Sequence, residues 1–69
     1  MRSVAGKRDG RAYTPDEAVR FLMKWFDQER AIRIVAIAQA FGIKADALPK
    51  KGMVTLRVSG DRITIEVSE

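Results

Sequence analysis

The sequence predicts a small α+β domain with helices first and a β-hairpin last. Two patterns carry this prediction: residues 53–69 alternate apolar and polar side chains around Gly60-Asp61, and residues 14–17 have the composition of a helix start. The chain has 69 residues, which suffice for one domain with a marginal core. We therefore predict a flexible basic arm over residues 1–12 and a single α+β domain over residues 13–69.

The closing hairpin has one aliphatic and one polar face, as a half-buried antiparallel pair requires. With the turn at Gly60-Asp61, the expected aliphatic pairs are Val58–Ile63, Leu56–Ile65 and Val54–Val67. The expected polar pairs are Arg57–Thr64 and Thr55–Glu66. The aliphatic face should pack against the helices.

The first helix is predicted from Thr14, which caps it, Pro15 at its first position and Glu17, which completes a capping box. The apolar residues that follow cover more than half of a helical wheel: Ala18, Val19, Phe21, Leu22, Met23, Trp25 and Phe26. Aromatic residues at this spacing are usually core, so no small-molecule ligand is expected. This apolar face is wider than packing against the hairpin requires. The extra apolar surface favours a protein interface that includes Phe21, Met23, Trp25 and Phe26.

The apolar pattern changes phase across the polar residues 27–30. Two helices with a bend near residues 28–30 are predicted, with one long bent helix as the alternative. Gly42 is expected to end the second helix. Residues 44–52 are predicted as a short helical turn or a loop, since Pro49 disfavours helix at Leu48.

The formal net charge of +4 is unevenly distributed. Residues 1–13 hold four basic groups against one acid, and residues 44–52 hold three against one. Residues 14–43 are balanced, and residues 53–69 are slightly acidic. The arm and one loop are therefore the expected anion-binding parts.

Several function classes are disfavoured by composition. The chain has no Cys and no His, so the commonest metal ligands and general bases are missing, and no cofactor or metal is expected. The acidic and hydroxyl residues fall at caps, turns, exposed helix positions and chain ends, so we expect no enzyme. No secretory signal or membrane span is recognised, which predicts a cytoplasmic protein.

Residues 37–48 resemble the core of a helix-turn-helix. The resemblance rests on small Ala38, Gly42 four residues later, apolar Ile43 and apolar Leu48. With a capped helix before it and a hairpin after it, most of residues 14–68 resemble a winged helix-turn-helix domain. That resemblance implies a recognition helix in the major groove and the hairpin as a wing. The residues it would turn toward DNA are Lys44, Ala45, Asp46, Ala47, Lys50, Lys51, Arg57 and Arg62.

The first functional hypothesis is a non-catalytic DNA-binding regulator that acts as a homodimer. Its expected nucleic-acid-binding residues are Arg2, Lys7, Arg8, Arg11, Lys44, Lys50, Lys51, Arg57 and Arg62. The alternative is a protein-binding module, such as a small stand-alone inhibitor or adaptor that docks on a larger protein machine. A phage-type inhibitor is one example. The alternative is motivated by the wide apolar helix, the open hairpin edges and the lack of base-reading side chains between Lys44 and Leu48. RNA binding ranks third, because the polar face of the hairpin has no aromatic platform.

The path of residues 44–52 separates the two leading hypotheses. A helix that projects Lys44, Lys50 and Lys51 to one side would favour DNA, and a crossing loop would favour a protein partner.

Overall fold

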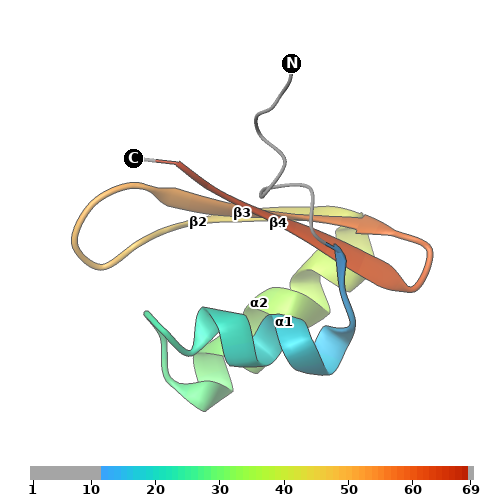
Figure 1. Cartoon of the computed structure of the whole chain (residues 1–69), viewed down its shortest axis with the longest axis horizontal. Helices are drawn as coiled ribbons and strands as arrows, with labels where there is room; N and C mark the ends of the chain where they lie inside the picture. Colours follow the sequence, from blue (N-terminus) through green and yellow to red (C-terminus); the bar gives the residue numbers. More distant parts are fainter. Residues whose placement is uncertain (1–11, 69) are drawn as a thin grey trace.

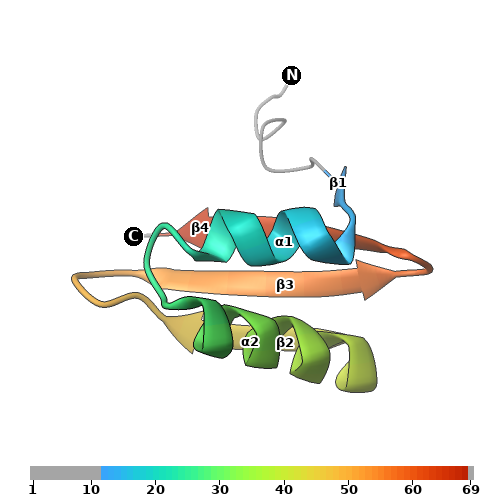
Figure 2. The ribbon, with the colours of Figure 1, turned by 90° about the horizontal axis from the view of Figure 1, so that it is seen from below.

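The computed structural model describes residues 12–68 and has two layers, a four-stranded antiparallel sheet with two helices on one of its faces (Figures 1 and 2). The elements in chain order are β1 (Ala12–Tyr13), α1 (Pro15–Leu22), α2 (Gln28–Phe41), β2 (Ile43–Ala47), β3 (Met53–Ser59) and β4 (Arg62–Ser68). The strand order in the sheet is β1-β4-β3-β2. The predicted α+β class, with the hairpin packed on two helices, is confirmed. Within residues 12–68, no helix is long and apolar enough to cross a membrane.

The β3–β4 hairpin has the predicted register. Val58 pairs with Ile63, Leu56 with Ile65 and Val54 with Val67. The aliphatic face lies toward the helices, and the core consists of Ala18, Leu22, Ala31, Ile34, Val35, Ala38, Val54, Leu56, Ile63 and Ile65. Val67 departs from this pattern, since 42% of it remains exposed.

The helix starts are set by side-chain caps. The backbone N–H of Thr14 donates to Glu17 Oε1 at 3.0 Å, and the Glu17 N–H donates to Thr14 Oγ1 at 3.2 Å, so the predicted capping box is present. The side chain of Asp27 caps α2 by accepting the N–H of Arg30 at 2.8 Å. Two helices are therefore present, but the break spans residues 23–27 and lies before the predicted bend at 28–30. The physical reason is that Asp27 starts a helix by satisfying a free N–H group.

Residues 43–47 form β2, so the expectation of a short helical turn before Pro49 is wrong. Ile43 to Ala47 pair antiparallel with Arg57 to Met53, and a loop over residues 48–52 connects the two strands. The local sequence, rich in alanine, has little strand preference. Pairing gives hydrogen-bond partners to the free edge of β3, a tertiary effect that overrides local preference. The β3 edge of the hairpin is thus closed, contrary to the expectation of open edges on both sides.

Gly42 allows the sharp turn from α2 into β2. Its φ is +88°, and its N–H donates to the carbonyl oxygen of Ala38 at 2.6 Å. A side chain added at this position would meet no atom within 4 Å, so a substitution there costs backbone strain alone.

We expect Gly42→Ala to lower the free energy of unfolding by about 1 kcal/mol, because a left-handed backbone is unfavourable for a residue with a Cβ. Urea unfolding followed by circular dichroism measures this loss. Gly42→Asn is the matched control and should lose less free energy of unfolding than Gly42→Ala, since asparagine tolerates the left-handed conformation better than alanine does. Equal midpoints for wild type and Gly42→Ala would contradict the assigned turn.

Candidate functional site

A groove opens where the end of α1, the loop after β2 and the end of β4 come together. It has a volume of about 570 Å³ and is lined by Lys24, Trp25, Leu48, Pro49, Lys50, Lys51 and Val67. We refer to these residues as the Trp25 groove. Three separate chain segments build it, so no local sequence motif encodes it.

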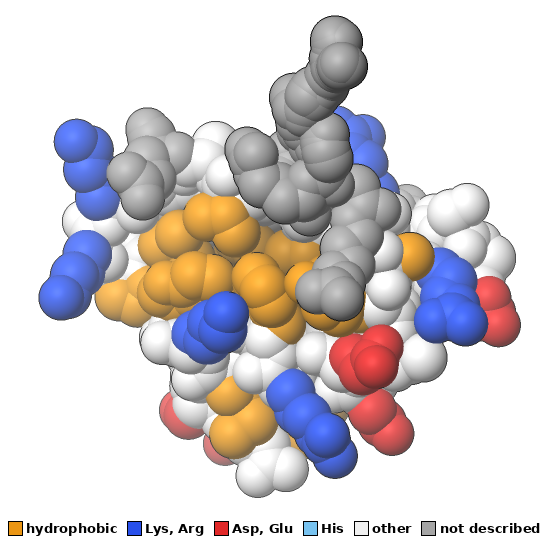
Figure 3. All heavy atoms as spheres, in the orientation of Figure 1, with side chains coloured by type: hydrophobic (Ala, Val, Ile, Leu, Met, Phe, Trp, Pro, Cys, Tyr) orange, Lys and Arg blue, Asp and Glu red, His pale blue; other side chains and the backbone are white. Residues whose placement is uncertain are grey.

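The groove has an apolar floor. Trp25 is half-buried, lies just after α1 and is not among the side chains packed against the buried core. Its ring centroid is 5.4 Å from that of Phe21, which is 5.4 Å from that of Tyr13. Viewed from the side of α1 and β4, the molecule shows a band of apolar side chains between the sheet and the helices (Figure 3). Much of this surface stays accessible, including nearly half of Val67.

The rim of the groove is basic. Lys50 and Lys51 are exposed in the loop after β2, and the Lys24 ammonium lies 4.5 Å from the centroid of the Phe21 ring. Between residues 12 and 68 the ion pairs are Arg30–Asp46, Arg33–Glu29 and Arg57–Glu66, so none of these three lysines has a carboxylate partner there. Within residues 12–68, no acidic residue lines the groove. The groove therefore combines apolar contact area with positive charge that no carboxylate of residues 12–68 pairs with.

The residues predicted to bind nucleic acid are dispersed. Arg2, Lys7, Arg8 and Arg11 lie outside the described residues. Lys44 lines a separate hollow with Arg30 and Asp46, on the outer edge of the sheet.

The remaining predicted basic residues divide between two faces. Arg57 lies 3.9 Å from Glu66, and both belong to the polar face of the hairpin. Arg62 lines a hollow with Tyr13 and Phe21. Of the predicted nucleic-acid-binding residues that the structure describes, Lys50 and Lys51 line the Trp25 groove.

The predicted protein interface is also divided. Phe21 and Trp25 are neighbours. Phe26 lines a second hollow together with Trp25, and its ring centroid is 5.2 Å from the Arg30 guanidinium carbon. Met23 lies on a different surface beside Ile32, where 47% of Met23 is exposed. Sequence reasoning found Trp25 but missed Lys24, Leu48, Pro49 and Val67. Only the tertiary arrangement brings these four together.

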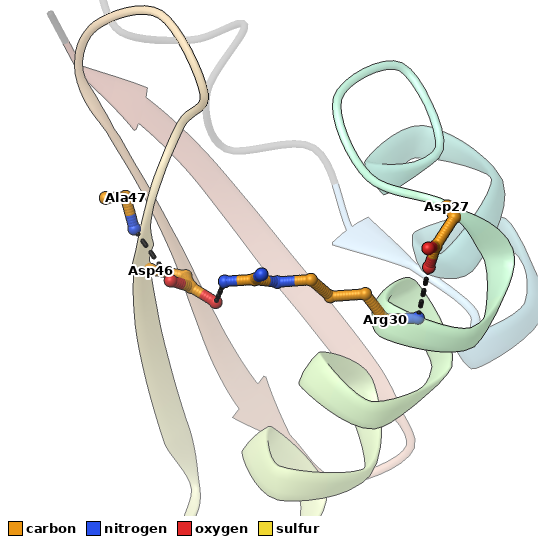
Figure 4. Close-up of polar contacts among 4 residues, drawn as sticks. All are labelled: Asp27, Arg30, Asp46 and Ala47. Carbon is orange, nitrogen blue, oxygen red and sulfur yellow. Dashed lines mark hydrogen bonds and ion pairs between the residues drawn. The ribbon is translucent and has the colours of Figure 1, made fainter.

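Arg30 links α2 to β2 through an ion pair with Asp46, at 3.5 Å between Nη2 and Oδ2 (Figure 4). Asp46 Oδ1 also accepts the N–H of Ala47 at 2.9 Å. Both side chains of the ion pair are partly exposed, and such pairs contribute less than about 1 kcal/mol. This contact helps to hold α2 against the edge strand β2.

The described part of the chain contains no group of three or more His, Cys, Asp or Glu side chains arranged to hold a metal ion. Comparisons with protein-family models, curated proteins and solved structures find no match. The Trp25 groove is therefore the candidate functional site.

Proposed function

We propose that the protein is a non-catalytic protein-binding module, an inhibitor or adaptor that docks on a larger protein through the Trp25 groove. The observation that carries this proposal is a partly exposed tryptophan and an exposed valine beside three lysines that have no carboxylate partner within residues 12–68. Aromatic anchors in a concave site are typical of the energetic centres of protein interfaces. The basic side chains at the rim would steer and orient a partner of opposite sign.

The path of residues 44–52 also supports a protein partner. The winged helix-turn-helix resemblance would place Lys44 to Ala47 on a recognition helix, and these residues lie in β2. A strand whose edge is overlaid by α2 offers no helix for the major groove.

DNA binding as a homodimer is the second candidate, and the exposed Lys50 and Lys51 favour it. Phosphate contacts by such lysines would give an affinity that falls steeply as salt rises. The aromatic floor of the Trp25 groove has no role in contacts of this kind with duplex backbone, so we rank DNA below a protein partner.

The test is affinity capture from an extract of the cells in which the protein is naturally made. Wild-type protein should retain a defined partner, and Trp25→Ala should reduce the retained amount at least about tenfold, because interface tryptophans commonly contribute more than 1.4 kcal/mol. Val67→Arg, which fills the groove without removing a buried side chain, should have the same effect. Circular dichroism checks that both variants are folded.

Phe41→Ala is the matched control, since Phe41 is 77% exposed and does not line the groove. It should retain the partner as wild type does. Salt-sensitive binding to a DNA duplex that survives Trp25→Ala, with no protein retained, would replace this proposal with the second candidate.

A further inference from the structure

A second hollow lies beside the Trp25 groove, on the side of α2 and β2. It has a volume of about 340 Å³ and is lined by Trp25, Phe26, Asp27, Arg30, Ala47 and Pro49. We refer to these residues as the Phe26 hollow. Trp25 and Pro49 line both depressions, so they form the ridge between them. A ligand that reaches both depressions would therefore cross this ridge.

The Phe26 hollow offers apolar contact between charged groups that already have partners. Phe26 is half-buried and packs against the core, and the Arg30 guanidinium carbon lies 5.2 Å from its ring centroid. The guanidinium group also pairs with Asp46, and the side chain of Asp27 accepts the N–H of Arg30 as the helix cap (Figure 4). An apolar side chain is therefore the ligand group that suits this hollow.

The Trp25 groove, on the other side of the ridge, differs in charge. Lys24, Lys50 and Lys51 line it, and within residues 12–68 none of them has a carboxylate partner. Several cations around one concave surface raise its positive potential, which attracts carboxylates. Acidic ligand groups therefore suit the Trp25 groove, and an apolar ligand group suits the Phe26 hollow.

A protein segment supplies both kinds of group better than the other possible occupants do. Residues 1–11 hold one acid against four basic groups, and one acid cannot neutralise three lysines. A second copy of the chain has the same net charge of +4 and would bring further lysines to the groove. The backbone of a nucleic-acid duplex is negatively charged, but it has no apolar side chain for the Phe26 hollow.

Resting on the proposed function, we propose that the partner binds through a short acidic segment that crosses the ridge formed by Trp25 and Pro49. Carboxylates of the segment lie in the Trp25 groove beside its three lysines. One apolar side chain of the segment enters the Phe26 hollow. Two or three residues of extended chain span roughly 7–10 Å, enough to pass one aromatic side chain, so the acidic and apolar residues are near neighbours in the partner's sequence.

The first experiment uses the single tryptophan of the chain as a fluorescent probe of the ridge. The test peptides carry one leucine, a short glycine–serine spacer and a run of glutamates, in both orders along the peptide. Matched peptides have serine in place of leucine or glutamine in place of glutamate. We expect one order of the test peptide to shift the emission of Trp25 and to bind at least about tenfold more tightly than either matched peptide.

Three results of the first experiment overturn the proposal. They are absence of binding by the test peptide in both orders, equal binding by a matched peptide, and the same shift of Trp25 emission with a DNA duplex in place of the peptide.

The second experiment tests the charged half of the site by substitution. Lys50→Glu/Lys51→Glu should weaken binding of the test peptide at least about tenfold and should weaken the glutamine peptide much less, because only the glutamates depend on the two ammonium groups. Arg33→Glu/Arg57→Glu makes the same change in net charge on other surfaces and should bind like wild type. Equal losses in the two double variants would attribute binding to net charge alone and overturn the proposal.

The third experiment tests the apolar half. Ala47→Gln places a larger uncharged side chain in the Phe26 hollow, so it should weaken the test peptide at least about fivefold and leave the serine peptide unchanged. Ala45→Gln is the matched control, because Ala45 is exposed on the same strand and lines neither depression. Circular dichroism checks that each variant is folded. Equal binding of the test peptide by the two variants overturns the proposal.

The two levels of inference fail differently. A captured protein partner that is lost with Trp25→Ala but kept by Lys50→Glu/Lys51→Glu and by Ala47→Gln refutes the acidic segment and leaves the protein-binding function intact. Absence of any protein partner refutes the function itself.

Discussion

Leu56→Ala is expected to remove more than half of the free energy of unfolding of the protein. Leu56 is fully buried in β3, where it faces the helices beside Ile65. Removing a buried leucine side chain costs about 3 kcal/mol through lost transfer free energy and the cavity left behind. A domain of this size has a stability of about 5 kcal/mol, so most of it would be lost.

Urea unfolding monitored by circular dichroism measures this effect. Met53→Ala is the control on the same strand, since 43% of Met53 is exposed, and its loss should be several-fold smaller. Leu56→Met nearly conserves volume and should cost less than about 1.5 kcal/mol, which keeps a folded variant available for comparison. If Leu56→Ala and Met53→Ala cost the same, the core does not lie between the hairpin and the helices.

Ala38→Leu is expected to destabilise the protein by about 2 kcal/mol through overpacking. Ala38 and Ala31 are both fully buried on α2, on the side that packs against the sheet. The small side chain allows the helix to lie close to the strands, and a leucine would have to displace either the helix or its neighbours. The change raises hydrophobicity and barely alters helix propensity, so steric crowding alone predicts the loss.

Ala40→Leu provides the matched control, because Ala40 belongs to the same helix and is exposed. Its thermal midpoint should stay close to that of wild type, while that of Ala38→Leu should fall by several degrees. A stabilised Ala38→Leu would show spare room between α2 and the sheet and would refute close packing there.

The elements predicted correctly from sequence are those with a strong local cause. The β3–β4 hairpin was predicted in register because a two-residue turn leaves only one pairing that buries a whole aliphatic face. The start of α1 was predicted because Thr14 and Glu17 satisfy each other's backbone N–H groups. Gly42 was predicted as a helix end, and it adopts the left-handed conformation that glycine favours.

The elements predicted wrongly depend on partners distant in sequence. β2 has weak local preferences and exists because β3 offers it an open edge. The break between the helices was placed too late, because Asp27 could be read either as part of a polar helical face or as a cap. Tyr13, which lies beside Phe21, belongs to β1 and pairs with Ile63 of β4, fifty residues away in sequence.

The sequence by itself determined that this chain is a small basic α+β domain with a closing hairpin, because turn chemistry, capping and alternation act over a few residues. Only the tertiary structure decided which lysines share a surface with Trp25. Lys24, Lys50 and Val67 are far apart along the chain, and they line one groove because the sheet brings the β2–β3 loop beside the end of α1. The composition gives the net charge of a protein. The position of that charge relative to an apolar groove depends on the packing of the whole fold.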